Sequence, residues 1–190
     1  MRNKRRRYWL LLWVLASLAI LTGALRWILV PYRIVGSSMA PTLTGEEGGI
    51  RPVAGDIVLV NRLAYVFGPC KRWDIVVIRR KEAATSDSLS LENVKRIVGL
   101  PGETLSIRDG ALHVNGSRVD YPYPHSSLYA VSKEKFGLVP VTLKENEYFL
   151  LGDNSYLSAD SRRWGPIQRE EIQGRVALRL FPLRRFGSVR

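Results

Sequence analysis

The sequence predicts a mostly β protein, with an antiparallel β-sheet or partly open barrel carried by one N-terminal transmembrane helix. Three observations predict it. A long uncharged apolar run stands near the N-terminus. After Pro31 the chain consists of short alternating or apolar runs separated by glycine, proline, asparagine and aspartate, which is typical of antiparallel strands. Long amphipathic helical patterns are missing there, so we expect one β domain over residues 31–190.

The apolar run, residues 8–25, is long enough to cross most of a bilayer core, because 18 helical residues reach about 27 Å. The residues before it are basic and none is acidic: Arg2, Lys4, Arg5, Arg6 and Arg7. A cleavable secretory peptide is the alternative, but it would end in small residues, whereas the sequence WILVP follows here. We therefore expect a retained anchor over residues 8–30. Residues 1–7 then form a basic cytoplasmic tail, and the β domain lies outside the cytoplasm.

The β domain is expected to contain the following strands: Ile57–Asn61, Ile75–Arg79, Val94–Val98, Leu105–Arg108, Ala111–Val114, Glu147–Leu151 and Arg175–Phe181. Two dipeptides, Asp109-Gly110 and Asn115-Gly116, predict tight hairpins, because both central residues of a type I′ turn need a positive φ. They belong to a small excursion over about residues 104–146. Ser127–Phe136 is either a short helix or a surface loop, and Arg169–Ile172 is expected to form one helical turn.

The basic charge of the chain favours a membrane surface over nucleic acid. The formal net charge is +12, but much of the excess precedes the apolar run, and the other clusters lack the aromatic residues that stack on bases. Cys70 is the one cysteine and stands in a turn-like stretch, which predicts an unpaired surface or boundary thiol. With two histidines, His113 and His125, the chain has too few ligands for a common zinc site, and we expect no metal and no cofactor.

Ser38 is a candidate nucleophile in the run GSSMAPTL. If residues 32–38 are extended, Tyr32, Ile34 and Gly36 share a face with Ser38, which places apolar side chains beside the hydroxyl. The proline that follows ends regular structure and leaves amides near the serine that could stabilise an oxyanion. A loop serine commonly acts only as a hydrogen bonder in a turn, so Ser38 needs a partner that can take its proton.

Lys95 is the candidate base. It interrupts a predicted strand of apolar residues, where burial would lower its pKa and keep the amine neutral. The alternative is a lysine on an edge strand that points into water. The histidines are weaker candidates, because His113 falls in a predicted hairpin and His125 in a loop.

A run of small polar residues, 152–165, follows the strand Glu147–Leu151. It could be a polar loop only. A functional loop is favoured, because Ser158 could orient an amine while Asp160 and Arg162 pair to brace the turn.

Together these segments closely resemble the type I signal peptidases, the membrane-anchored Ser/Lys proteases that remove signal peptides from exported proteins. The resemblance covers nearly the whole chain and rests on the order and spacing of motifs behind the anchor. The motifs are Ser38-Met39 with Pro41-Thr42-Leu43, Gly55-Asp56-Ile57-Val58, Lys95-Arg96 with Gly99, Pro101 and Gly102, and Gly152-Asp153-Asn154 with Ser158, Asp160, Ser161 and Arg162. The short excursion is similar to the compact form common in Gram-positive bacteria.

The resemblance implies a role for each motif. Ser38 would be the nucleophile of an acyl-enzyme mechanism, Lys95 the general base and later acid, and Ser158 a hydrogen bonder to the lysine amine. Structural support would come from Gly152, Asp160 and Arg162. Shallow pockets for the small residues at substrate positions −1 and −3, in Ala-X-Ala sites, would be lined by Tyr32, Ile34, Met39, Leu43 and Val94. The implied partners are signal peptides of exported preproteins and membrane lipids, and not nucleic acid.

One departure concerns the oxyanion hole. Some members of the family carry a serine or threonine two positions before the nucleophile, whose side chain can donate to the oxyanion. Gly36 stands at that position here. The hole would then depend on main-chain amides, chiefly that of Ser38.

Two other functions compete. A Ser/Lys autoprotease of the DNA-damage repressor type shares the dyad, but it would need a DNA-binding helical module and a soluble chain. A non-enzymatic anchored β protein would instead bind anionic lipid or a secreted partner through its basic surface. That function predicts no effect of Ser38→Ala and a clear effect of neutralising Arg184 and Arg185.

Overall fold

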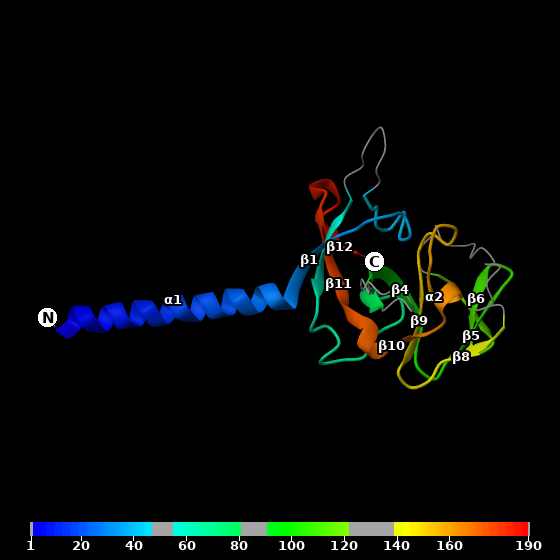
Figure 1. The fold of residues 1–190 in the computed structure, drawn as a ribbon, viewed down its shortest axis with the longest axis horizontal. Helices are drawn as coiled ribbons and strands as arrows, with labels where there is room; N and C mark the ends of the chain where they lie inside the picture. The colour runs from blue at the N-terminus through cyan, green and yellow to red at the C-terminus, as the bar shows by residue number, and fades with distance from the viewer. Residues whose placement is uncertain (1, 47–54, 81–90, 122–138, 190) are drawn as a thin grey trace, which may run out of the picture.

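The computed structural model describes residues 2–46, 55–80, 91–121 and 139–189. A long helix, α1 (Arg2–Ile28), leads into a β-rich domain and projects away from it (Figure 1). Within α1, Tyr8–Ile28 has a mean hydropathy of 2.0 and is not buried by the rest of the chain, so it is long and apolar enough to cross a membrane. The helix ends slightly earlier than expected, because Leu29 and Val30 already belong to the first strand.

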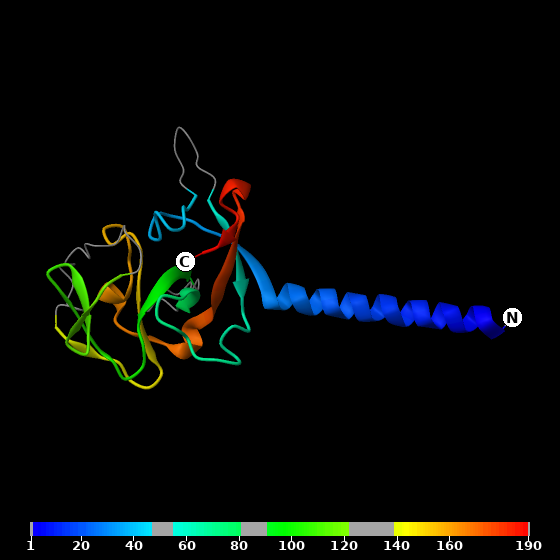
Figure 2. The same cartoon turned by 180° about the vertical axis from the view of Figure 1, so that it is seen from behind.

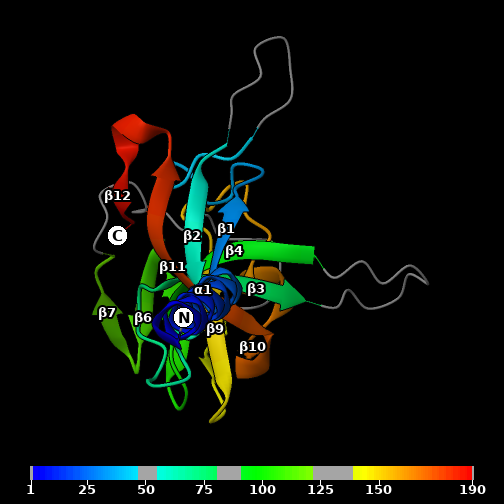
Figure 3. The ribbon, with the colours of Figure 1, turned by 90° about the vertical axis from the view of Figure 1, so that its left-hand side faces the viewer.

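A large open sheet forms the body of the domain. Its strands are ordered β1-β2-β11-β3-β4-β9-β10, with β12 paired to β11, and neighbours are antiparallel. The strands are β1 (Leu29–Arg33), β2 (Ile57–Asn61), β3 (Ile75–Arg80), β4 (Leu91–Gly99), β9 (Glu147–Leu151), β10 (Ile167–Gln168), β11 (Ile172–Phe181) and β12 (Gly187–Ser188). Since β1 and β10 do not pair, the barrel is not closed. Viewed along α1, β3 and β4 cross the direction of β1 and β2, so the sheet is strongly twisted (Figure 3).

A second sheet of four strands, ordered β7-β6-β5-β8, lies at the end of the domain away from α1 (Figures 1 and 2). It consists of β5 (Thr104–Arg108), β6 (Ala111–Val114), β7 (Ser117–Val119) and β8 (Val141–Thr142). Both expected hairpin turns are present, because Asp109, Gly110, Asn115 and Gly116 all have φ between 50° and 81°. This sheet occupies the expected excursion. Ser127–Phe136 and His125 lie outside the described residues.

All seven predicted strands are confirmed, three of them with the predicted bounds, and the others differ by one to three residues at an end. The helical turn is also confirmed as η1 (Arg169–Glu171), while η2 (Leu183–Arg185) follows β11. A further short helix, α2 (Ser161–Trp164), was not expected. It begins after Asp160, whose carboxylate accepts a hydrogen bond from the backbone N–H of Arg162.

The expectation of a surface or boundary thiol at Cys70 is wrong. Its thiol is free but buried, and it packs in an apolar cluster that includes Tyr65 and Tyr148. Burial raises the pKa of the thiol. The Gly-Pro-Cys-Lys sequence does form a connection between strands, but residues of β3 and β9 pack over the Cys70 side chain. Local sequence cannot predict this burial, because the covering strands come from other parts of the chain.

Candidate active site

Ser38 lies in a turn and not on an extended strand. β1 ends at Arg33, Val35 makes an isolated bridge to Glu46, and residues 36–43 form turns and bends. The expected single extended face over residues 32–38 is therefore wrong beyond Ile34. The chain departs from it at Gly36, whose φ of 74° favours a residue without a side chain. The loop after β9 holds the turn, because the backbone N–H of Asn154 donates to the carbonyl oxygen of Ser38 at 3.0 Å.

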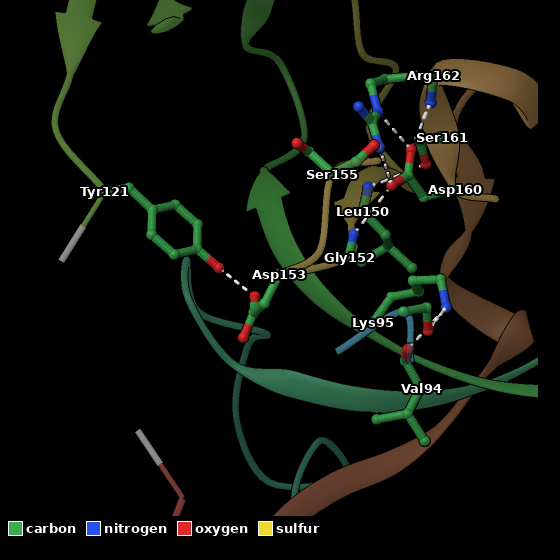
Figure 4. Close-up of polar contacts among 11 residues, drawn as sticks. Val94, Lys95, Tyr121, Leu150, Gly152, Asp153, Ser155, Asp160, Ser161 and Arg162 are labelled. Atoms are coloured by element: carbon green, nitrogen blue, oxygen red, sulfur yellow. Dashed lines mark hydrogen bonds and ion pairs between the residues drawn. The ribbon is translucent and has the colours of Figure 1, made fainter. Parts of the chain in front are cut away.

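Lys95 meets Ser38 from the middle of β4. Its Nζ lies 2.8 Å from Oγ of Ser38 and 2.9 Å from the carbonyl oxygen of Val94. Figure 4 shows the contact between Lys95 and Val94. In β4 the lysine pairs with Val76 of β3, which is fully buried. Because side chains alternate along a strand, Arg96 points to the opposite face. The structure thus brings together the two residues that the sequence identifies as nucleophile and base.

The surroundings of Lys95 favour its neutral form. The residue is only 2% exposed, so the edge-strand alternative does not apply. Burial lowers the pKa of its ammonium group to about 8, although the carboxylates of Asp160 and Asp153 act in the opposite direction. At mildly alkaline pH a large fraction of the amine is therefore unprotonated. Such an amine can accept the proton of the Ser38 hydroxyl.

A cleft of about 160 Å³ opens beside this pair. Four of the five expected pocket residues lie in its wall: Tyr32, Ile34, Met39 and Val94. Leu43 does not; its side chain is fully buried in the apolar cluster behind Ile34 and Met39, which corrects the expectation that it contacts a substrate. Val77 and Glu92 also line the cleft, and the sequence did not point to either.

The polar loop after β9 is built around the buried carboxylate of Asp160. Its Oδ2 accepts from the backbone N–H of Gly152 at 3.0 Å, and Arg162 donates to both oxygens, through Nε at 2.9 Å and through a terminal nitrogen at 2.8 Å (Figure 4). The same guanidinium donates to the carbonyl oxygen of Ser155 at 2.8 Å. The next residue, Ser161, accepts a hydrogen bond from the backbone of β9. The expected bracing pair is present and ties the loop to the end of β9.

Gly152 is where this loop passes Ser38. A Cβ at that position would lie 2.2 Å from Oγ of Ser158 and 2.5 Å from the carbonyl oxygen of Ser38, which leaves no room for a side chain. Ser158 therefore lies close to the Ser38 turn, as expected. Its Oγ is buried and has no hydrogen-bond partner among the described residues, so the predicted bond to the lysine amine is not formed here. That role stays a prediction.

Asp153 was missed as a site residue. Arg96, which is fully buried, binds it through two hydrogen bonds of 2.9 and 2.7 Å, and the hydroxyl of Tyr121 donates to it as well. This ion pair joins the strand that carries Lys95 to the loop that carries Gly152. A signal was present in the sequence, because a second basic residue beside Lys95 in an apolar strand must find a buried partner.

Asp56 is the second carboxylate with a structural role beside the site. It accepts from the backbone N–H of Thr44 at 3.0 Å and forms ion pairs with Arg179 at 3.1 Å and Arg185 at 3.5 Å. Both arginines also donate to the carbonyl oxygen of Thr42. The end of β11 and the turn after it therefore hold the segment that follows Ser38. The sequence motif marked Asp56, but not the two distant arginines.

Among residues 2–46, 55–80, 91–121 and 139–189, no group of three or more histidine, cysteine, aspartate or glutamate side chains could hold a metal ion. His113 lies in the hairpin strand β6, as the sequence indicated, and that strand belongs to the second sheet, whereas Lys95 lies in the large one.

Known proteins match the chain over most of its length. The family model described as "Signal peptidase, peptidase S26" matches residues 6–181. Signal peptidase I of Bacillus caldolyticus is 33% identical over 194 residues, covering 98% of this chain and 96% of that protein. Signal peptidase I T of Bacillus subtilis is 34% identical over 157 residues, covering 80% and 74%. A crystal structure of a signal peptidase I from Enterococcus faecalis aligns at 30% identity with a TM-score of 0.45, covering 57% of this chain and 97% of that one.

The match of the family model to nearly the whole chain, and the coverage of the Bacillus caldolyticus relative, agree with the motifs that gave the resemblance. The chain belongs to the signal peptidase I family of serine peptidases.

Proposed function

We propose that this protein is a membrane-bound serine endopeptidase that removes N-terminal signal peptides from exported preproteins, with Ser38 as nucleophile and Lys95 as general base. The observation that carries the proposal is the 2.8 Å contact between Oγ of Ser38 and Nζ of a lysine that is 2% exposed. A serine needs a base within hydrogen-bond reach, and a lysine can be that base only where burial keeps it neutral.

The reaction proceeds in two halves. In the first, Oγ of Ser38 attacks the scissile carbonyl while its proton passes to the neutral amine of Lys95. The ammonium then returns the proton to the leaving amine, the peptide bond breaks and an ester to Ser38 remains. In the second half, Lys95 takes a proton from water, which attacks the ester, and gives that proton back to Oγ of Ser38. Each half uses the same amine first as base and then as acid.

The oxyanion of each tetrahedral intermediate needs a donor. The backbone N–H of Ser38 has no hydrogen-bond acceptor among the described residues, which supports its use for this purpose. Gly36 brings no side-chain donor, in agreement with a hole built from the main chain.

The cleft supports recognition of an extended peptide. β9 pairs with β4 only from Arg96 onward, so Val94 and Lys95 have β3 on one side and the cleft on the other. A peptide that runs along this part of β4 gains main-chain hydrogen bonds there. Met39 and Ile34 line the cleft and are almost fully buried, which supports shallow apolar pockets for small side chains at positions −1 and −3.

The anchor supports a location at the membrane. α1 is exposed along its apolar stretch, and the basic residues before it favour a cytoplasmic N-terminus. The catalytic domain then lies on the extracytoplasmic side, where signal peptides emerge.

Cleavage of a preprotein by the purified full-length protein tests the proposal. Mass spectrometry should find one cut after an Ala-X-Ala site, and leucine or phenylalanine at position −1 should block it. Ser38→Ala and Lys95→Ala should abolish cleavage with folding intact, while Ser37→Ala is the matched control and should remain active. Full activity of either dyad variant would refute the mechanism. A burst of released mature protein before steady turnover is expected, because its amine leaves when the ester forms, while the signal peptide stays bound to Ser38 until water hydrolyses that ester.

A further inference from the structure

Two arginines and a tryptophan surround a pocket where the domain meets the end of α1. The pocket holds about 290 Å³ and is lined by Trp27, Arg62, Leu63, Val66, Arg79 and Gln173. It is separate from the substrate cleft, and the peptidase mechanism uses none of its residues. We propose that this pocket binds the phosphate headgroup of an anionic phospholipid from the membrane that α1 crosses.

The position of the pocket fits a lipid. Trp27 lies at the end of α1 and is 65% exposed, which is the setting in which tryptophan marks the membrane interface. The turn after β2 is hydrogen-bonded to the end of α1, because the backbone N–H of Arg62 donates to the carbonyl oxygen of Ile28 at 2.9 Å. That turn lies on the side of the domain from which α1 leaves (Figures 1 and 2). A headgroup next to α1 therefore lies at the level of this pocket.

The turn also presents apolar side chains outward. Val66 is 61% exposed and Phe67 is 87% exposed. An exposed apolar pair at the tip of a turn is costly in water but not in the acyl region just below the headgroups. The turn thus has an apolar tip that fits the acyl region. Its basic residue, Arg62, stands at the start of the turn, directly after β2.

The charges of the pocket fit a phosphate. Arg62 lines it, and its Nε has no hydrogen-bond partner among the described residues. Arg79 forms an ion pair with Glu92, but that pair is largely exposed, and a guanidinium has five donors, so it can serve a phosphate as well. Gln173 adds a neutral amide, which donates to the backbone of η1.

Each of the two arginines already has a hydrogen-bond partner that orients its side chain. Arg62 donates to the hydroxyl of Tyr32 at 3.2 Å, and Arg79 donates to Glu92 at 2.6 Å. Side chains oriented in this way lose less conformational freedom when a ligand binds. Arginine is also a common ligand of phosphate, because its guanidinium can donate two parallel hydrogen bonds to the phosphate oxygens.

This inference rests on α1 crossing the membrane and not on the Ser38–Lys95 chemistry, so its test measures binding. Full-length protein in neutral detergent is titrated with short-chain phosphatidylglycerol, and bound lipid is followed by native mass spectrometry. Phosphatidylglycerol should bind more tightly than phosphatidylcholine of equal chain length. Arg62→Gln and Arg79→Gln should each weaken binding about fivefold, and both together about 25-fold, because one basic residue near an anionic lipid surface contributes about that much.

The matched control is Arg108→Gln with Arg118→Gln, which removes the same charge from the sheet at the far end of the domain. An equal loss of binding in this control overturns the site, because it would show a general charge effect. Glycerol phosphate separates a lipid site from a simple anion site: it should bind far more weakly than the lipid, and equal affinity overturns the proposal.

A second measurement needs no change of charge. Phosphatidylglycerol brominated near the headgroup should quench tryptophan fluorescence more than brominated phosphatidylcholine does, and Trp27→Phe should remove the difference. Equal quenching by the two lipids in the wild-type protein would contradict the proposal, even if the arginine variants fail to fold.

Discussion

Replacing Lys95 with methionine should stabilise the protein at neutral pH while it abolishes cleavage. The lysine is 2% exposed, and burial lowers its pKa from 10.5 to about 8. A buried amine whose pKa is lowered binds its proton less tightly in the folded than in the unfolded state. The resulting penalty on folding is fully present below the folded pKa, decreases as the pH rises, and vanishes above the unfolded pKa. Methionine has a similar length and no charge, so it removes this penalty.

The magnitude follows from the two pKa values. At pH 7 the penalty is about 3 kcal/mol, and at pH 10 it has fallen to about 1 kcal/mol. Lys95→Met also removes the hydrogen bonds to Ser38 and to the carbonyl oxygen of Val94, at a cost that does not depend on pH. The quantity to measure is therefore the change with pH. Between pH 7 and pH 10 the advantage of the variant over the wild type should shrink by about 2 kcal/mol.

Urea unfolding of the full-length protein in one detergent, followed by tryptophan fluorescence at both pH values, measures this difference. Other titrating groups cancel, because they are present in both proteins. A variant whose advantage is the same at pH 7 and pH 10 would show that Lys95 is not held at a lowered pKa. The hydrogen-bonded contact with Ser38 would then not be enough to make it a base.

Three further results are expected. The kcat/KM for preprotein cleavage should rise about tenfold from pH 7 to pH 9 and level off above about pH 9, because the neutral fraction of Lys95 rises through its pKa of about 8. Gly152→Ala should lower kcat/KM about 100-fold, because its Cβ displaces the backbone of Ser38, and a misplacement of about 1 Å has that effect on catalysis. Asp160→Asn should lower the free energy of unfolding by about 3–5 kcal/mol in urea titrations, because it removes one of the two charges of a buried ion pair.

Each of these predictions has an outcome that would contradict it, and each of the two substitutions also has a control variant in the same chain. A cleavage rate that does not change with pH contradicts a lysine base. Gly68→Ala adds a methyl group in open space and should leave cleavage unchanged; if Gly152→Ala is equally harmless, the close passage is not what positions the serine. Asp120→Asn removes an ion pair that is largely exposed, so its effect on stability should be close to zero.

The strands could be predicted because they depend on local patterns. Ile57–Asn61 and Ala111–Val114 alternate or run apolar between turn residues, and the two hairpin turns need the positive φ that their residues supply. The pairing of strands distant in the chain could not be predicted in this way. β11 enters between β2 and β3, and only this placement brings Arg179 and Arg185 to the segment after Ser38.

The errors share a physical cause. The expected extended run through Ser38 assumed that strand geometry continues past Arg33, but a glycine with positive φ and a contact with the loop after β9 turn the chain instead. Leu43 is expected at a pocket surface from the family resemblance, and Cys70 at the protein surface from its turn-like Gly-Pro-Cys-Lys stretch. Both are buried by strands that arrive from elsewhere in the sequence. Local sequence predicts backbone shape better than it predicts which face is covered.

Lys95 and Arg96 are neighbours in β4, but their side chains have different hydrogen-bond partners. Both are buried, but Arg96 faces a carboxylate that binds it through two hydrogen bonds, which compensates the buried charge and makes the guanidinium a structural link. Lys95 faces a hydroxyl and a carbonyl oxygen, and the nearest carboxylates compensate its burial only in part, so the pKa remains lowered. Strand alternation makes the distinction possible, because it turns one side chain to Asp153 and the next to Ser38. The lowered pKa of Lys95, on which the proposed role as base depends, therefore reflects both its burial and the fact that the carboxylate of Asp153 binds Arg96 instead.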